Sequence, residues 1–131
     1  MLLVEELTWM DIAKINRGKC PVLLPVGSVE QHGPLLPLAT DLLLAREVAV
    51  KAAKKLEGKL NVLVLPPIPV GFSAHHLDFP GTLTVTHETL YRYVYEVCKS
   101  VLKNGFKVLV VVNGHGGNIP ALKAALQRLK L

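Results

Sequence analysis

Three short apolar runs limit the possible folds of this chain more than any other feature of its sequence. The runs cover residues 21–26, 61–65 and 107–112, and nearly every position in them is apolar. Continuously apolar strands are typical of parallel sheets that are buried on both faces, whereas strands buried on one face alternate with polar residues. Segments with helical spacing cover residues 8–17, 41–57, 86–104 and the residues after Asn118. The alternation of strands and helices therefore predicts a parallel α/β layered domain.

Turn-forming and capping residues mark the ends of the predicted helices. Thr8 and Asp11 have the spacing of a capping box at the start of the first helix. Gly58 and Gly105 follow the second and third helices and predict their ends. Asn118 is a candidate N-cap for the last helix, in which Pro120 suits the first turn.

The predicted sheet is narrow for a chain of this composition. Half of the 131 residues are apolar and the mean hydropathy is +0.38, although a single small domain must keep much of its surface polar. Three strands are fewer than the four to six that most sheets hold. We expect that a partner subunit or a C-terminal half supplies the missing surface. The alternative is a fourth strand over residues 82–85.

Charge and cysteine content exclude several classes of protein. The net charge of +5 comes from dispersed lysines and scattered arginines, so we expect no nucleic-acid partner. Cys20 and Cys98 are too few for a disulfide framework. The N-terminal residues include Glu5 and Glu6 and lack a basic segment, which argues against a signal peptide. No apolar run is long enough to span a membrane, and a cytoplasmic location is the simplest expectation.

Polar side chains with metal-binding chemistry follow the first apolar run. Glu30 and His32 lie two residues apart, so in an extended chain both point to the same side. Gly33 and the prolines after it turn the chain back to Asp41, at the start of a helix. Taken singly, Glu30 fits a solvated surface group, His32 a structural histidine and Asp41 an N-cap. Together, directly after a buried strand, they predict a metal site.

The loop after the third apolar run supplies a fourth candidate ligand. Residues 113–118 read Asn-Gly-His-Gly-Gly-Asn, and His115 lies between glycines that allow close backbone approach or a positive φ. The alternative is a glycine-rich anion cradle at a helix N-terminus, which needs no histidine. Because the carboxyl ends of parallel strands share one edge of the sheet, we expect His115 to meet the first cluster. This mixture of ligands suits Zn, Mn or Fe(II), and Asp41 is the best candidate to bridge two ions.

A long irregular segment, residues 66–84, contains further candidate site residues. Loops of this length in compact domains are usually functional. We assign His76 as the candidate catalytic residue for proton transfer, and Ser73 and His75 as candidates for substrate binding. The alternative is that these side chains only hydrogen-bond the loop in place.

Four motifs in this order resemble the creatininase (creatinine amidohydrolase) family. They are Pro-Val-Gly-Ser-Val-Glu-Gln-His-Gly-Pro at 25–34, Pro-Leu-Ala-Thr-Asp at 37–41, Phe-Pro-Gly-Thr at 79–82 and the 113–118 loop. The resemblance implies a three-layer α/β/α fold with a mostly parallel sheet, a two-metal site of Zn, Mn or Fe, and often a hexamer. It implies that Glu30, His32, Asp41 and His115 are metal ligands, with Asp41 bridging.

This chain differs from the family pattern in two ways. Creatininase itself has a glutamate two residues after the histidine that His115 matches, and here that position is Gly117. Members with two glycines there take a glutamate ligand from a later segment, and the C-terminal part of the family also carries substrate-covering aromatics and a histidine proton donor. The second difference is that residues 1–131 do not include this later segment. The resemblance therefore implies that residues 1–131 form a single creatininase-like domain, equivalent to the N-terminal portion of a family member.

The sequence supports one leading hypothesis and two alternatives. The leading one is a metal-dependent amidohydrolase in which metal-bound hydroxide attacks a cyclic or formyl amide, a small-molecule substrate. We expect two divalent ions and a homo-oligomer. The second is a truncated, non-catalytic module that oligomerises through its open sheet edge and has a partial metal site. The third is a phosphate-binding domain that uses the 113–118 loop.

Overall fold

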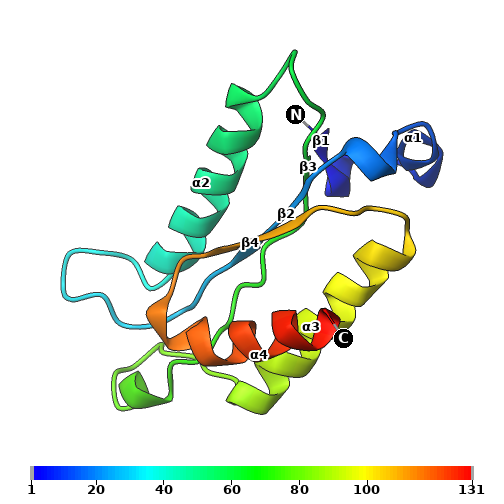
Figure 1. Ribbon diagram of the computed structural model, residues 1–131. Coiled ribbons are helices and arrows are strands. Elements are labelled where there is room, and N and C mark those ends of the chain that lie inside the picture. The colour runs from blue at the N-terminus through cyan, green and yellow to red at the C-terminus, as the bar shows by residue number, and fades with distance from the viewer. Residues whose placement is uncertain (1, 131) are drawn as a thin grey trace.

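The computed structural model describes residues 2–130 and contains one parallel sheet (Figure 1). Its strands are β1 (Leu2–Leu3), β2 (Val22–Val26), β3 (Leu63–Val64) and β4 (Leu109–Asn113), in the spatial order β1-β3-β2-β4. The longest pairing runs from Val22 opposite Leu109 to Val26 opposite Asn113. The three apolar runs therefore form parallel strands, as predicted.

The fourth strand does not lie where the sequence suggested. It is β1, which pairs in parallel with β3 at the edge of the sheet. Within residues 82–85, Leu83 makes only an isolated antiparallel bridge to Val29. This bridge closes the long loop over the residues that follow β2, so the 82–85 segment belongs to the surroundings of the site and not to the sheet.

Helices cover both faces of the sheet, which gives the three layers that the family resemblance implies (Figure 1). One face packs on α2 (Thr40–Lys55) through a cluster that includes Leu23, Ala49 and Val64. The other packs on α3 (His87–Lys103) and α4 (Ile119–Leu129) through a cluster that includes Leu24, Val94 and Ala125. No helix within residues 2–130 combines the length and the apolar character needed to cross a membrane.

The helix ends follow the predicted chemistry with two exceptions. Thr8 and Asp11 form the capping box of α1 (Trp9–Ala13), but this helix ends four residues before Arg17. Gly58 and Gly105 have φ values of +82° and +94° just beyond α2 and α3. Asn118 makes no capping hydrogen bond to α4, because its side chain is engaged elsewhere. Four short 3-10 turns complete the elements: Val4–Glu6, Arg17–Lys19, Ala74–His76 and Gly116–Asn118.

The strand β4 is less buried than its composition predicts. The valines on either side of Leu109, its first residue, are exposed to solvent: Val108 is 47% exposed and Val110 is 44% exposed. The reason is the strand order, since β4 lies at an edge and only β2 pairs with it. Leu44 and Val48 of α2 are also more than half exposed. Continuous apolar sequence therefore indicates burial on both faces for β2 but not for β4.

Candidate metal centre

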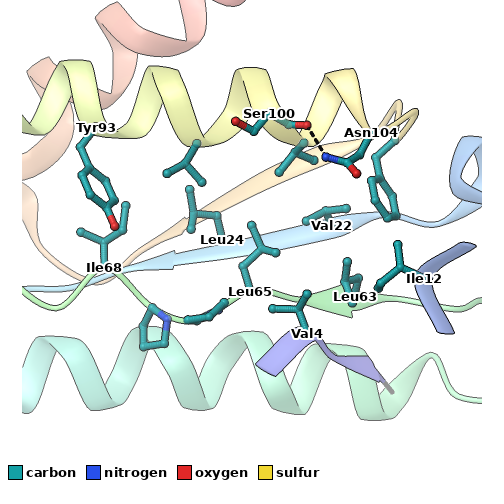
Figure 2. Close-up of a pocket in the computed structure, with 15 residues that line it drawn as sticks. Val4, Ile12, Val22, Leu24, Leu63, Leu65, Ile68, Tyr93, Ser100 and Asn104 are labelled. Carbon is teal, nitrogen blue, oxygen red and sulfur yellow. Dashed lines mark hydrogen bonds between the residues drawn. The ribbon is translucent and has the colours of Figure 1, made fainter. Parts of the chain in front are cut away.

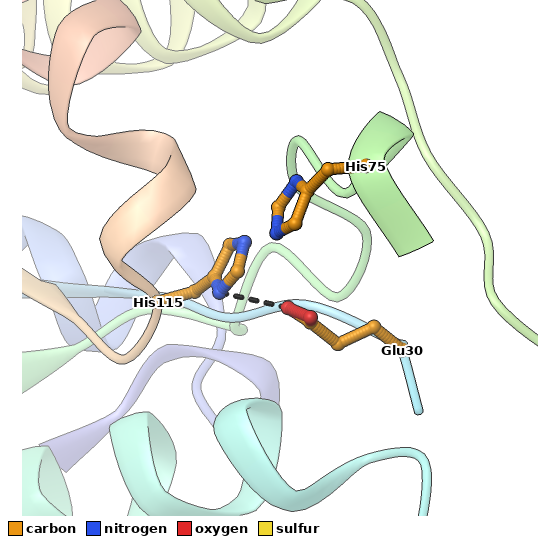
Figure 3. Close-up of side chains that lie close together, drawn as sticks. All are labelled: Glu30, His75 and His115. Atoms are coloured by element: carbon orange, nitrogen blue, oxygen red, sulfur yellow. Dashed lines mark ion pairs between the residues drawn. The ribbon is translucent and has the colours of Figure 1, made fainter. Parts of the chain in front are cut away.

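The predicted site residues meet at the carboxyl ends of β2 and β4, although they are far apart in the sequence. Glu30 follows β2, Asp41 lies in the first turn of α2, and His115 follows β4. The 3-10 turn Ala74–His76 brings two more histidines to the same place. Figure 3 shows Glu30, His75 and His115 converging from three separate segments. This edge of a parallel sheet is where α/β proteins build their sites.

His115 lies at the centre of the cluster between two buried carboxylates. Its Nδ1 atom is 2.8 Å from Oε1 of Glu30 and 3.0 Å from Oδ2 of Asp41. The side chain of Glu30 is 3% exposed and that of Asp41 12%. Asp41 is therefore part of the cluster and does not cap α2, whose N-cap residue is Ala39.

The other ring nitrogen of His115 is held by the backbone. Nε2 lies 2.7 Å from the carbonyl oxygen of Phe72, an acceptor, so Nε2 must carry a proton to donate. In a neutral ring, Nδ1 would then point a lone pair at two carboxylate oxygens. Lone pairs cannot face one another at these distances, so a proton or a metal ion must lie between Nδ1 and the carboxylate oxygens. A backbone carbonyl on the far nitrogen is the usual support of a metal-binding histidine.

His32 contacts the other oxygen of Asp41. The distance from His32 Nε2 to Asp41 Oδ1 is 3.1 Å, while Nδ1 lies 3.3 Å from the carbonyl oxygen of Glu30. Asp41 thus offers one oxygen to His32 and the other to His115. His32 therefore contacts Asp41, while Glu30 contacts His115.

Two serine hydroxyls hold the carboxylates in place. Ser28 Oγ is 2.8 Å from Asp41 Oδ2 and 3.3 Å from Glu30 Oε1, and Ser73 Oγ is 3.4 Å from the same Glu30 oxygen. Both serines are completely buried. Ser73, which we predicted to bind substrate, is placed to orient Glu30. Sequence reasoning missed Ser28, although it lies two residues before Glu30 in the motif at 25–34.

His76 connects the buried carboxylate to the open side of the cluster. Its Nε2 atom lies 3.2 Å from Oε2 of Glu30, and its Nδ1 atom lies 3.3 Å from the side-chain nitrogen of Gln31. An amide nitrogen can only donate, so the proton of a neutral His76 ring lies on Nε2, facing Glu30. Gln31 is a second contributor that sequence reasoning did not identify.

Two glycines of the 113–118 loop are required by close packing. A Cβ atom at Gly117 would lie 2.6 Å from both the Phe72 carbonyl oxygen and Nε2 of His115. At Gly114 it would collide with the backbone of Asp41. Neither glycine has a positive φ, so close approach is the reason for their presence.

Asn118 joins the three segments that carry the cluster. Its side-chain nitrogen donates to the carbonyl oxygen of Gly27 at 3.0 Å and to Oδ1 of Asn113 at 3.2 Å. Its side-chain oxygen accepts from the Phe72 amide at 2.9 Å. These bonds link the end of β2, the 66–84 segment and the end of β4, and Asn118 is completely buried. The asparagine predicted to cap a helix therefore fixes the positions of the site segments.

The donor set fits a divalent ion. Among residues 2–130, no lysine or arginine forms an ion pair with Glu30 or Asp41, so histidines supply their only counter-charges there. Buried carboxylates need a positive partner, and carboxylate–imidazole sets suit Zn, Mn and Fe(II).

The cavity in Figure 2 lies away from the metal centre, under α3. It has a volume of about 410 Å³, is lined by apolar residues such as Leu24 and Leu63, and contains none of the candidate ligands.

Comparison with known proteins identifies the family of this chain. A family model described as creatininase, creatinine amidohydrolase, matches residues 5–131. The chain belongs to the creatininase family. A mycofactocin precursor peptide peptidase from Mycobacterium ulcerans is 40% identical over 114 residues, covering 83% of this chain and 45% of that protein. Creatinine amidohydrolase from Pseudomonas putida is 31% identical over 137 residues, covering 97% and 51%.

The fold comparison gives the same result. A solved creatininase described as its Mn form superposes with a TM-score of 0.82 at 30% identity, and the match covers 98% of this chain and 52% of that one. This creatininase-family chain thus has the family's α/β/α fold, and the named relatives are hydrolases. It spans about half the length of the curated relatives it matches.

Proposed function

We propose that this chain carries the metal centre of a hydrolase that cleaves the C–N bond of a cyclic or formyl amide. The observation that carries the proposal is the position of His115 Nδ1, within 3.0 Å of two buried carboxylates while Nε2 is bound to a backbone carbonyl. This arrangement suits a ring that binds a cation through Nδ1. The names of the relatives, a peptidase, a creatinine amidohydrolase and a formylamino-pyrimidine deformylase, all describe hydrolysis of amide C–N bonds, and the last two support the cyclic and formyl types.

We propose two ions held by four residues. Glu30, Asp41 and His115 would bind the first, while His32 and Asp41 would bind the second. The support for a pair is that the two oxygens of Asp41 face different histidines. Carboxylates that bridge in this way hold two ions about 3.5–4 Å apart in many hydrolases. Mn and Zn both suit these ligands, and the Mn form of the solved creatininase favours testing Mn first.

The side chains around the ions have separate tasks in this proposal. A divalent ion bound by these residues would supply an activated water and a Lewis acid for the amide carbonyl. Ser28 and Ser73 keep the carboxylates oriented so that they need not reorganise during the reaction. His76 is partly exposed beside Glu30, and in its doubly protonated form it would donate the Nε2 proton to the leaving nitrogen and become neutral.

Metal analysis with two aspartate variants tests the proposal. Asp41→Ala removes the shared ligand, whereas Asp78→Ala removes an exposed aspartate outside the cluster. After removal of metal and incubation with Mn or Zn, we expect the wild-type chain and the Asp78 variant to retain the ion. The Asp41 variant should bind it at least about tenfold more weakly. Equal metal content in the two variants would count against the site.

A hydrolysis assay tests the reaction class. Creatinine and an N-formyl aromatic amine represent the two kinds of amide that the proposal allows, and a dipeptide represents the linear peptide bond named by one relative. We expect hydrolysis of creatinine or of the formyl amide, dependent on added Mn or Zn and absent in Asp41→Ala. Turnover that survives a chelator would argue for a different mechanism.

The alternative function, a non-catalytic oligomerising module, is favoured by the open edge of β4. Val108 and Val110 are exposed there, and an unpaired apolar strand edge promotes association. We propose a homo-oligomer in either case, and a hexamer and a cytoplasmic location stay predictions. Sedimentation of the wild-type chain and of Val110→Lys tests the assembly. An oligomer that binds no metal would favour the module over the hydrolase.

A further inference from the structure

The His75 imidazole lies at the metal centre but has a different environment from the other histidines there. His32, His76 and His115 each have ring nitrogens engaged by protein oxygens or by an amide. Within residues 2–130, the His75 ring makes no hydrogen bond or ion pair, and its ring contacts are with Phe72, His76 and His115. It is exposed, at the open side of the cluster.

The ring is oriented toward the two residues at the centre of the site. One donor atom each of Glu30, His75 and His115 lie within 4.8 Å of one another. The rings of His75 and His115 are parallel within 3°, with their centroids 6.1 Å apart. Figure 3 shows the His75 ring pointing from its own turn toward His115 and Glu30. A histidine that only anchored the loop would direct its nitrogens to loop atoms.

We propose that His75 is a direct metal ligand, which joins Glu30, Asp41 and His115 at the first proposed ion. The inference rests on the proposed metal centre and changes the role predicted for His75 from substrate binding to metal binding. Mixed imidazole and carboxylate ligands are typical of catalytic zinc and of iron(II) in oxygenases. Four protein ligands would leave a position open for water or substrate on a five- or six-coordinate ion.

The geometry requires only a small movement. Neighbouring donor atoms that bind one ion at about 2.1 Å lie about 3.0–3.4 Å apart. The present spacing of up to 4.8 Å must therefore contract by roughly 1–2 Å when the ion binds. His75 can supply this movement because it is exposed on a short turn, whereas Glu30 and His115 are fixed by buried contacts.

His76 is a weaker candidate for the same position. Its Nε2 atom already faces Oε2 of Glu30, and its Nδ1 atom accepts from Gln31. Recruiting it as a ligand would break one of these contacts. His75 can bind an ion without losing a hydrogen bond, so the structure favours it over its neighbour.

Cobalt binding to the full chain tests the proposal. Co²⁺ reports its ligands through visible absorption, and X-ray absorption counts the imidazoles around it. His75→Ala should lower cobalt affinity about tenfold or more and remove one imidazole from the count. His87→Ala is the matched control, because His87 is also exposed and stacks on Phe72 at 3.6 Å outside the cluster. This control should bind cobalt as the wild-type chain does.

The outcomes separate this inference from the proposed function. If His75→Ala keeps the wild-type affinity and imidazole count while Glu30→Gln loses the metal, the proposed metal centre is supported. The proposal that His75 is a ligand is then wrong. If Glu30→Gln also keeps the metal, both proposals fail. A raised KM with unchanged metal binding in His75→Ala would restore the substrate-binding role and overturn the inference. Because His75 is exposed, the variant should fold, which circular dichroism checks.

Discussion

Nε2 of His115 lies 2.7 Å from the carbonyl oxygen of Phe72, and this contact decides which nitrogen is available to a metal. Because the carbonyl can only accept, the proton stays on Nε2 and Nδ1 becomes the donor atom. We predict that zinc binding shifts the ¹⁵N resonance of Nδ1 to the metal-bound range while Nε2 keeps its proton. Nitrogen–proton correlation spectra of the imidazole rings provide the measurement. Coordination through Nε2 would contradict the structure.

The same contact makes Gly117 sensitive to substitution. A methyl group there would lie 2.6 Å from both atoms of the His115–Phe72 pair, so Gly117→Ala must displace one of them. We expect about 1–3 kcal/mol of destabilisation and about tenfold weaker zinc binding. Gly116→Ala is the control, because no atom lies within 4 Å of its added Cβ. Titration calorimetry of the two variants gives the comparison, and equal zinc affinities would contradict the geometry.

Asn118 should matter more for stability than a helix cap would. Asn118→Ala leaves the Gly27 carbonyl and the Phe72 amide without their partner inside the protein. We predict a loss of roughly 2–4 kcal/mol in the free energy of unfolding. Asn104→Ala is the control, since that exposed side chain donates only to the carbonyl oxygen of Ser100. Urea unfolding of the two variants without metal measures the difference, and similar losses would show that the buried network contributes little.

Much of the fold follows from local patterns along the chain. The strands β2 and β4 and the helices α2, α3 and α4 match the predicted segments closely, because apolar runs, helical spacing and glycine stops all act within a few residues. The exposure of β4 depends on strand order, which a local pattern does not encode. The two-residue strand β1 is too short to leave a recognisable pattern.

In the site, too, some residues could be identified from local sequence and others only from the folded structure. Glu30, His32, Asp41 and His115 were identifiable from their chemistry and from their places after strands, and the structure brings them together. Sequence reasoning did not find the site roles of three other residues, Ser28, Gln31 and Asn118. Polar residues of these types are common in loops, and their roles depend on partners up to 91 residues away. The roles of His75 and His76 stay predictions.

The buried thiol of Cys98 predicts a pH dependence of stability. Burial raises the pKa of Cys98 from 9.0 to about 11. Below pH 9 the thiol keeps its proton in both the folded and the unfolded chain, so its contribution to stability is fully present. As the pH rises from 9 towards about 11, the unfolded chain loses the proton first, and stability falls.

The experiment compares urea unfolding at pH 8 and pH 10.5 in the wild-type chain and in Cys98→Ala. The free energy of unfolding should fall more steeply with pH in the wild-type chain. Parallel pH dependences in the two proteins would show that the Cys98 thiol does not contribute.

The central claim is that residues far apart in the sequence bind a common cation, and anomalous X-ray scattering tests it most directly. Crystals grown with Zn or Mn would be measured on both sides of the absorption edge of the metal. We predict an anomalous peak between Glu30, Asp41 and His115, within about 2.0–2.3 Å of a donor atom of each. A well-ordered cluster with no peak there, in crystals that contain the metal, would contradict the account.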